Sequence, residues 1–561
     1  MRISRTTLDR RERWGPPLLA LCACALVAST WHVFSSIWDE PEHIAAGLAL
    51  IERGQYLYDD QHPPLARMAA AIGPYLAGAR LPAHASGDGS TSGEEPGRQI
   101  LYHSMVGHDT LLTLARCGML PFLALLIAAL WQWTRREHGA ASAWLCAGFL
   151  LTTPPILGHA GVAALDLPVT ALCTLSFYLL LRWLQTPDLR HSLRLGLAAG
   201  LATATKLSAV PFIGCAGLVL GLAQVLLLRD ASRPFRPGIR LRGLVLIVLV
   251  ALLVVIAVYG PHFVYMTTPD LRPSKALDLL VGRRGALHDA GYRWAARIPV
   301  PLGVQEVALN ILGVAWHNAR GHLSYLLGRT GQMGWWYFYP VALAVKTPLP
   351  LLALGLGGLG FMGARGWRRR SLSLLAPPLC FITILAFSCA YSHINIGVRH
   401  VLVLYPLLAI GAAQASIALW SWSRAPALRI ALLALLGWQA ATLPAAYPDF
   451  LAWFNVTAGD HPERILVDSD LDWGQDLKRL SAELARRRVP EVAIAYLGTA
   501  DLSLEQLPPF RMLVPGQPTT GWVAIDLKSR LERRAAYAWL DAATPVTRVG
   551  RSIDLYDIAP R

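Results

Sequence analysis

The sequence is poor in charge, and poorest in acidic residues. Only 16% of its 561 residues are charged, with 36 Asp and Glu against 51 Lys and Arg, while 54% are hydrophobic. This composition excludes an ordinary multidomain soluble enzyme, which needs more surface charge at this length. The net charge of +15 comes from short basic segments between apolar runs, and no long basic stripe interleaved with aromatic residues is present. Nucleic acid is therefore not an expected partner.

Cysteine is present without a pattern. The eight cysteines fall in or beside apolar segments, where thiols act as small hydrophobic groups. Their spacing matches neither a disulfide framework nor a zinc site. We therefore expect neither a disulfide scaffold nor a structural zinc.

Long apolar runs recur from residue 17 to residue 447. Many reach the roughly 20 residues that a helix needs to cross about 30 Å of hydrocarbon. We predict an all-α polytopic membrane protein with about eleven transmembrane helices. The predicted spans are 17–37, 111–133, 140–157, 167–184, 193–206, 209–228, 244–265, 339–362, 374–391, 401–420 and 430–447.

Basic residues indicate how the spans are oriented. Arginines before the first span predict a cytoplasmic N-terminus. We divide residues 193–228 into two spans that turn near Lys206, because a single span would put the next Arg-rich loop outside. The long loops 38–109 and 266–336 then face outside, and the basic segments fall on the cytoplasmic side: 135–136, 182–194, 229–242, 365–370 and 424–429.

The chain changes character after residue 447. Residues 448–561 are mixed and charged, which predicts a transmembrane domain over 1–447 and a small extracytoplasmic α/β domain over 448–561. In this second domain the pattern predicts a helix at 477–488 and strands at 464–470, 491–498, 522–527 and 552–558.

Acidic residues at the membrane boundary are candidates for chemistry, because ionisable groups are costly to keep there. Asp39 and Glu40 follow the first span together with Glu42. Asp39 and Glu42 fit a helix-capping pattern, which is the first alternative, and the three carboxylates together also suit a general base. Asp166 lies at the outer entrance of the span 167–184, where it is either an N-cap or a site residue.

Three cations are predicted near the same face, namely Arg116, Lys206 and Arg399, the last of them close to His393. Together they could hold a phosphate, while snorkelling to lipid headgroups is the alternative for each one. His62 begins a His-Pro-Pro turn that says little alone. Acids and cations at one face, beside an apolar surface, fit a reaction with a lipid-phosphate leaving group and an acceptor hydroxyl.

These motifs resemble the GT-C superfamily of polyprenyl-phosphate-sugar-dependent glycosyltransferases, in particular its protein O-mannosyltransferase and aminoarabinose-transferase branch. The resemblance covers residues 31 to about 447. Segments 393–400 and 468–476 look like a bacterial subgroup. The remaining motifs, in chain order, are Asp39-Glu40, His62-Pro63-Pro64-Leu65, Arg116, Asp166 and Thr205-Lys206.

The resemblance implies roles for the candidate residues. Asp39 would be the base that deprotonates the acceptor, with Glu40 beside it, and Asp166 would orient the acceptor or the sugar. The donor and its departing phosphate would be held by a basic set consisting of Arg116, Lys206, Arg399, His62 and His393.

The resemblance also implies the reaction and its place. It implies an inverting transfer from a polyprenyl-phosphate-linked sugar, with undecaprenyl phosphate as the lipid, at the outer face of a bacterial cytoplasmic (inner) membrane. The acceptor is a glycan, a lipid or a protein. Loop 266–336 lacks an evident large sugar-binding insert, which counts against a protein acceptor. Some members use a divalent metal, but no ligand set in this sequence requires one.

Two other classes fit a chain with many spans. A transporter or flippase of lipid-linked or envelope substrates would also carry charges at membrane depth, but its halves often show matching broken helices, and no such pairing is visible here. A non-enzymatic scaffold that carries an exported domain would tolerate Asn at both Asp39 and Asp166.

Overall fold

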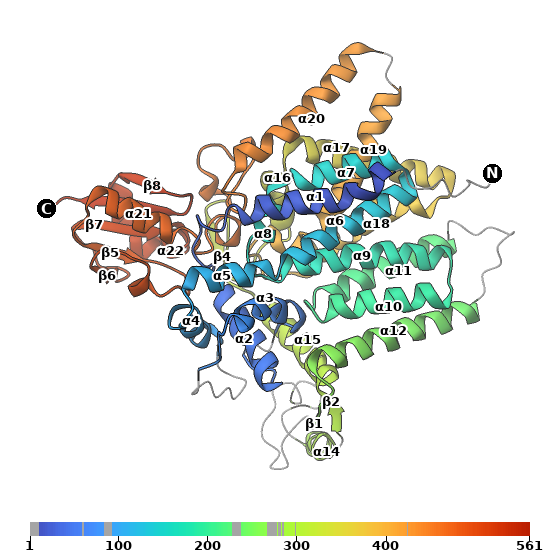
Figure 1. Ribbon diagram of the computed structural model, residues 1–561, viewed down its shortest axis with the longest axis horizontal. Coiled ribbons are helices and arrows are strands. Elements are labelled where there is room, and N and C mark those ends of the chain that lie inside the picture. Colours follow the sequence, from blue (N-terminus) through green and yellow to red (C-terminus); the bar gives the residue numbers. More distant parts are fainter. Residues whose placement is uncertain are drawn as a thin grey trace.

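The computed structural model describes residues 10–58, 61–82, 92–226, 237–265, 278, 282, 285–297, 299–422 and 425–560. Figure 1 shows a body of long helices with the N-terminal end of the chain at one extremity and a small sheet domain at the other. The predicted fold class is confirmed: a helical, multi-pass membrane protein carries a small α/β region near its C-terminus.

The helical body follows the predicted spans closely. Each of the predicted apolar segments contains a helix, because backbone groups in lipid must be hydrogen-bonded within the segment. The helices of this body are α1 (Arg10–Ala28), α5 (His108–Cys117), α6 (Leu120–His138), α7 (Ala140–Leu151), α8 (Pro154–Ala160), α9 (Asp166–Gln185), α10 (Leu189–Thr203), α11 (Ala209–Leu226), α12 (Pro237–Tyr259), α16 (Phe338–Lys346), α17 (Leu349–Arg369), α18 (Leu372–Tyr391), α19 (Leu404–Trp422) and α20 (Pro426–Ala446).

Fewer of the described helices than the eleven predicted spans are long enough to cross a membrane. Among the described residues, eight helices are long and apolar enough to cross a membrane, or nine if α7 and α8 form one span. Helix α10 has 15 residues, and the apolar part of α1, Trp14–Ala28, is also short. The count of eleven spans therefore stays a prediction, whereas the division of residues 193–228 into two helices is confirmed by α10 and α11.

Two predicted spans are interrupted by proline. The segment 140–157 is bent by 68° between α7 and α8, where Pro154 and Pro155 begin the second helix. The segment 339–362 breaks at Pro348, between α16 and α17. Proline lacks an N–H and disfavours helical backbone in the residue before it, so both continuous spans were wrong in this respect.

The two long loops are themselves structured. Loop 38–109 forms α2 (Glu40–Arg53), α3 (Leu65–Leu76) and α4 (Glu94–Tyr102), with α2 packed between the other two. Loop 266–336 lies partly outside the described residues. Its described part contains α14 (Ala286–Ala295), α15 (Leu302–Arg320) and the hairpin of β3 (Ser324–Leu326) with β4 (Arg329–Gly331). Strand β1 (Phe263–Tyr265) pairs antiparallel with β2 (Pro299–Pro301) and brings α15 against α12.

The C-terminal region contains a five-stranded sheet in the order β6-β5-β7-β9-β8. Strands β5 (Val492–Ala495), β6 (Phe510–Met512) and β7 (Gly521–Asp526) are parallel, and β9 (Ile553–Ile558) and β8 (Thr547–Val549) complete the sheet in antiparallel pairing. Helices α21 (Leu477–Arg487) and α22 (Leu527–Glu532) accompany it, with the 3-10 helices η5 (Leu502–Leu504) and η6 (Arg534–Ala542).

The predicted helix at 477–488 and three of the predicted strands are confirmed. The strand predicted at 464–470 is wrong. This stretch forms the 3-10 helices η3 (Pro462–Arg464) and η4 (Asp468–Asp470), preceded by η2 (Val456–Ala458). Its polar groups bond both to the segment before α19, through Ser469 and Asp470, and to the C-terminal domain, where Asp468 pairs with Lys528.

Candidate active site

A cavity of about 510 Å³ lies where α9 and α11 begin and α18 ends. Part of its lining is a polar cluster of Asp39, Asp166, Lys206 and Arg399, which contact one another. The rest of the lining is mainly apolar and comes from α9, α11, α15, α18 and the residues just before α19, with Val169, Cys173, Val210, Phe212, Ile311, Val314, Phe387, Leu402 and Val403. The cavity therefore joins a charged head region to an apolar wall.

Asp39 directly precedes α2, yet its side chain makes no cap bond to that helix. Its carboxylate instead accepts a hydrogen bond of 2.9 Å from Nη1 of Arg399. The Asp39 side chain is 25% exposed, compared with 10% for Arg399 and 2% for Asp166. Asp39 therefore occupies the N-cap position of α2 without a side-chain cap bond, and its role as a site residue stays a prediction.

Asp166 is the first residue of α9 and is almost fully buried. It makes no cap bond, since Leu165 occupies the N-cap position. Its Oδ1 accepts a bond of 2.5 Å from Nζ of Lys206, and its Oδ2 lies 3.8 Å from Nη1 of Arg399. Lys206 comes from the turn between α10 and α11, so the division of that segment into two helices is what brings the cation to Asp166.

Arg399 links the two acids. It belongs to the 3-10 helix η1 (Val398–Val401), between α18 and α19. Burial alone would lower the pKa of Arg399, but the carboxylates of Asp39 and Asp166 raise it above its ordinary value. Its Nε is buried and has no hydrogen-bond partner among the described residues. A buried charged N–H group beside a cavity is a ready donor for an anionic ligand.

Glu40 and Arg116 lie elsewhere. The two side chains are buried against each other, with Nε of Arg116 2.8 Å from Oε1 of Glu40. The same carboxylate accepts the backbone N–H groups of Ile37 and Ala163, and Arg116 donates to the carbonyl of Ser35. Neither Glu40 nor Arg116 lines the cavity. We propose that this pair holds α2, α5 and the segment before α9 together, in place of the catalytic and phosphate-binding roles expected for it.

Of the two predicted histidines, one lines the cavity and the other does not. His62 lines the cavity. His393 does not, because its backbone N–H and its Nδ1 both engage Asn318 at the end of α15. Sequence reasoning did not select His317 of α15 or His400 of η1, which do line the cavity. Burial lowers the pKa of each of these two imidazoles, so both are neutral near pH 7 and each can donate one hydrogen bond and accept another.

A second group belongs to segment 468–476 of the C-terminal region, to which the sequence analysis assigned a resemblance but no role. The ring of Trp473 lies under the Arg399 guanidinium, 4.3 Å from its Cζ. The Asp470 carboxylate accepts the N–H of Val398, and Nζ of Lys346 donates to the Asp470 carbonyl. The signal that could have found these residues is the acid-rich stretch DSDLDWGQD, four aspartates in a chain otherwise poor in acid.

The acids of this cavity do not form a metal site. Among the residues that the structure describes, no group of three or more His, Cys, Asp or Glu side chains is arranged to hold an ion. Asp39 and Asp166 face Arg399 and Lys206 instead. The residues present therefore do not fit the divalent metal that some members of the resembled superfamily use.

Comparison with known proteins gives similarity in structure only. No protein-family model and no curated protein matches the sequence. The oligosaccharyltransferase of Archaeoglobus fulgidus in the apo form matches with a TM-score of 0.50 at 14% identity, over 91% of this chain and 62% of that one. The same enzyme tethered to an acceptor peptide matches with a TM-score of 0.50 at 12% identity, over 98% and 74%. ArnT from Cupriavidus metallidurans bound to undecaprenyl phosphate matches with a TM-score of 0.48 at 14% identity, over 97% and 98%.

The fold is thereby defined. The chain is a multi-pass membrane protein with the GT-C fold, the fold of membrane glycosyltransferases such as the archaeal oligosaccharyltransferase. The expected membership of this fold is confirmed.

Proposed function

We propose that the protein is a glycosyltransferase that moves a sugar from a polyprenyl-phosphate donor to an acceptor hydroxyl, with inversion. The observation that carries this proposal is the cavity itself, which joins two cations and a partly exposed carboxylate to an apolar wall. A fold shared with membrane glycosyltransferases supports it, and favours it over a transporter.

The donor has two chemically different parts, a charged phosphate and an apolar prenyl chain, and the cavity offers a partner for each. Lys206 and Arg399 supply positive charge for the phosphate, and the unpartnered Nε of Arg399 supplies a further donor. The apolar wall of α11, α15 and α18 suits the prenyl chain, because a hydrocarbon tail gains by leaving water. A lipid-linked phosphate satisfies both halves, whereas a free nucleotide sugar would leave the apolar half without a partner.

The reaction follows from the positions of the two acids. Asp39 is partly exposed and can take the proton of an incoming hydroxyl, while Asp166 is buried and keeps Lys206 and Arg399 in place. The acceptor oxygen attacks the anomeric carbon, the bond to the phosphate oxygen breaks, and the proton passes to Asp39. The polyprenyl phosphate leaves with its negative charge held by Lys206 and Arg399. Attack from the face opposite the leaving phosphate inverts the anomeric configuration.

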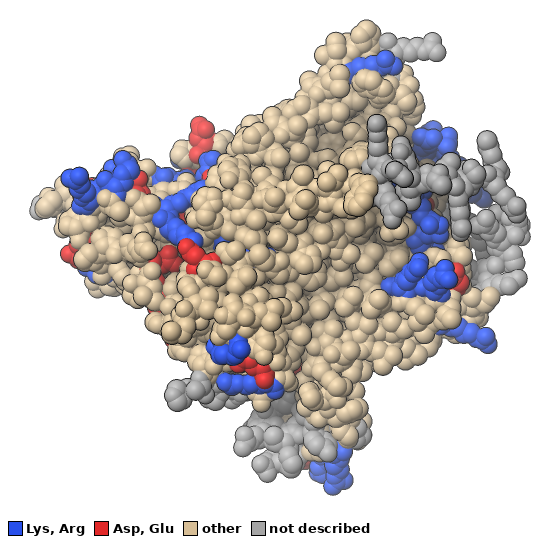
Figure 2. Space-filling model, viewed as in Figure 1, with Lys and Arg blue, Asp and Glu red and all other residues tan. Residues whose placement is uncertain are grey.

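The orientation proposed for the chain rests on its charge distribution. On the face shown in Figure 2, a broad belt almost without charge separates the sheet domain from a group of basic side chains at the far end of the helices. Because basic loops remain in the cytoplasm, we place the N-terminus inside and both the cavity and the C-terminal domain outside. From the resemblance of the sequence motifs we further propose that the membrane is a bacterial cytoplasmic membrane, that the donor sugar is linked to undecaprenyl phosphate, and that the acceptor is a glycan, lipid or protein at the outer face.

Asp39→Asn tests the proposal. Loss of a general base costs about 10²- to 10⁴-fold in rate, so we expect the envelope glycan to disappear and the lipid-linked donor to accumulate, both measured by mass spectrometry. Asp109→Asn is the matched control, since Asp109 is 70% exposed and pairs with Lys478 outside the cavity. Unchanged glycan in a well-expressed Asp39→Asn variant would remove Asp39 from the mechanism. Transfer by the purified protein in detergent, where there are no two sides, separates an enzyme from a flippase.

A further inference from the structure

We infer that residues 468–476 are a positioning strap for the active site, and that Trp473 is the positioning residue that holds Arg399 toward the donor phosphate. This inference rests on the proposed function. It gives the C-terminal domain a role in the reaction, because the strap is anchored in that domain and reaches into the helical body.

The first contact is made by the Trp473 ring. This side chain is 4% exposed and lies under the Arg399 guanidinium at 4.3 Å. On its other edge Trp473 meets the ring of His159 at a centroid distance of 5.9 Å, and it packs against Ile37 and Val162. The indole is thus fixed by its surroundings, and it offers a rigid aromatic face on which the cation rests.

The strap also fixes the backbone that carries Arg399. The Asp470 carboxylate accepts the N–H of Val398 at 3.0 Å, and the Ser469 hydroxyl donates to the carbonyl of Ile396 at 2.5 Å. Gly397, at φ 148°, lies so close that a Cβ there would be 2.4 Å from the Ser469 oxygen. The residues on both sides of Gly397 are therefore bonded to the strap where η1 begins.

The same strap holds the segment that carries Asp39. The carbonyl of Trp473 accepts the N–H of Trp38 at 3.0 Å, and the carbonyl of Gln475 accepts the N–H of Ser35 at 3.0 Å. The hydroxyl of Thr499, between β5 and η5, donates to the carbonyl of Trp38 at 2.9 Å. One short segment thereby sets both members of the Asp39–Arg399 pair, which come from positions 360 residues apart.

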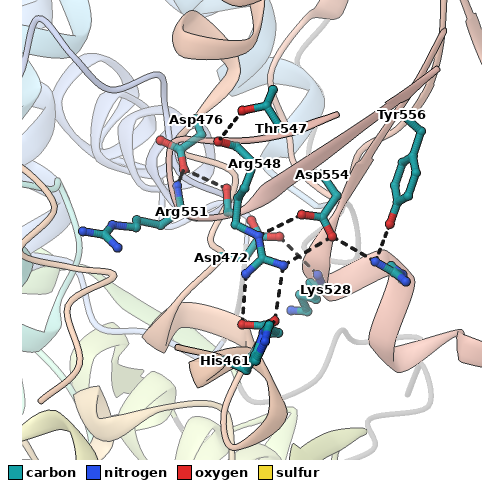
Figure 3. A network of polar contacts seen from close by, with 12 residues as sticks. His461, Asp472, Asp476, Lys528, Thr547, Arg548, Arg551, Asp554 and Tyr556 are labelled. Carbon is teal, nitrogen blue, oxygen red and sulfur yellow. Dashed lines mark hydrogen bonds and ion pairs between the residues drawn. The ribbon is translucent and has the colours of Figure 1, made fainter. Parts of the chain in front are cut away.

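The other side of the strap is tied to helix α22 and to the turn between β8 and β9. Asp472 accepts the N–H of Lys528, and Asp476 accepts the hydroxyl of Ser552 and the N–H of Arg551. Figure 3 shows these acids beside the Arg548–Asp554 pair of β8 and β9. Because the anchors are buried and hydrogen-bonded, displacement of the sheet domain would be transmitted to Trp473 and Asp470.

The test is the affinity of the purified full chain for undecaprenyl phosphate, which carries no sugar. A cation–π contact contributes a factor of roughly 2 at an exposed site and roughly 30 at a desolvated one, so we expect Trp473→Ala to weaken binding about 10-fold and Trp473→Phe less than about 3-fold. Trp539→Ala, in the same domain but outside the cavity lining, should bind as the wild type does. In an Arg399→Ala background, Trp473→Ala should have no further effect, because the contact it removes is already absent.

The outcomes distinguish the positioning role of Trp473 from the proposed phosphate site at Arg399. If Arg399→Ala weakens binding while Trp473→Ala does not, the inference is overturned and the proposed function stands. An equal loss from Trp473→Ala with and without Arg399 would also overturn it, since the indole would then act on general stability. If Arg399→Ala binds normally, the proposed phosphate site itself is wrong. Should Trp473→Ala fail to fold, Asp470→Ala must weaken binding and Asp470→Asn, which keeps an acceptor oxygen for Val398, must restore it.

Discussion

Glu532, at the end of α22, lies among acidic neighbours in the C-terminal domain. Burial raises the pKa of this carboxyl to about 7, and Asp468 and Asp526 add to the shift while Lys528 opposes it. Its ordinary pKa is 4.5. Between these two values the unfolded chain has released a proton that the folded chain retains. The free energy of unfolding therefore falls as the pH rises through this window.

Glu532→Gln should stabilise the protein at pH values above about 7, where the carboxylate of the folded wild type ionises. We expect an apparent Tm above that of the wild type by about 2 °C or more at pH 8, and no difference near pH 5, in thermal unfolding of the detergent-solubilised chain. Glu483→Gln is the control, because Arg486 and Arg487 lower the pKa of Glu483 to about 2 and its replacement should give no gain at pH 8. A Glu532→Gln variant that is less stable than the wild type at pH 8 would contradict this account.

Neighbouring residues of the same chemical type have different surroundings in this structure. Asp39 faces the cavity and Arg399, whereas Glu40, the next residue, is buried against Arg116. A step of one residue turns a helix by about 100°, so adjacent side chains point to different environments. The sequence was sufficient to place these four residues, Asp39, Glu40, Arg116 and Arg399, near one end of the helices. It could not assign the partners, which depend on contacts between segments 76 and 360 residues apart.

At the scale of elements, glycine residues allow helices α17 and α19 to approach each other closely. Gly358 and Gly411 face each other where the two helices cross, and a Cβ on Gly358 would lie 1.9 Å from the carbonyl oxygen of Gly411. Small residues allow this approach between helices that cross a membrane. The pair matters for the site because α19 begins just after η1, which carries Arg399.

Gly358→Ala should therefore force the two helices apart. Overpacking of this kind costs about 1–3 kcal/mol, and we expect a lower apparent Tm together with reduced transfer activity. Gly357→Ala is the matched control, since a Cβ at the adjacent glycine would have no atom within 4 Å. The measurement is thermal unfolding of both variants in one detergent. Equal stability of Gly358→Ala and Gly357→Ala would show that the crossing is looser than described.

The elements themselves were largely predictable, because hydrophobic length alone identifies helices in a membrane. The breaks at Pro154 and Pro348 follow from proline chemistry and were visible in the sequence, although the spans were drawn through them. Helix α15 was missed because polar residues such as Gln305, Asn310 and His317 interrupt its apolar pattern. The strand predicted at 464–470 was wrong because alternation of apolar residues does not reveal hydrogen bonds to distant segments such as Ile396–Val398.

At the scale of the whole molecule, charge and shape divide the chain along its long axis. Figures 1 and 2 together show the sheet domain at one end, basic side chains at the other and the uncharged belt between them. The cavity lies at the sheet-domain end of the helices, where the strap of residues 468–476 reaches Arg399. Under the proposed function, chemistry at one membrane face depends on a domain whose sheet lies wholly outside the helical body.

The most direct measurement is a cryo-EM structure of the full chain with undecaprenyl phosphate. The account predicts phosphate oxygens at hydrogen-bond distance, about 3 Å, from Nζ of Lys206 and from the guanidinium of Arg399, with the prenyl chain along Val210 and Phe212 of α11. A phosphate bound at the basic end of the helices, or outside the cavity altogether, would contradict it.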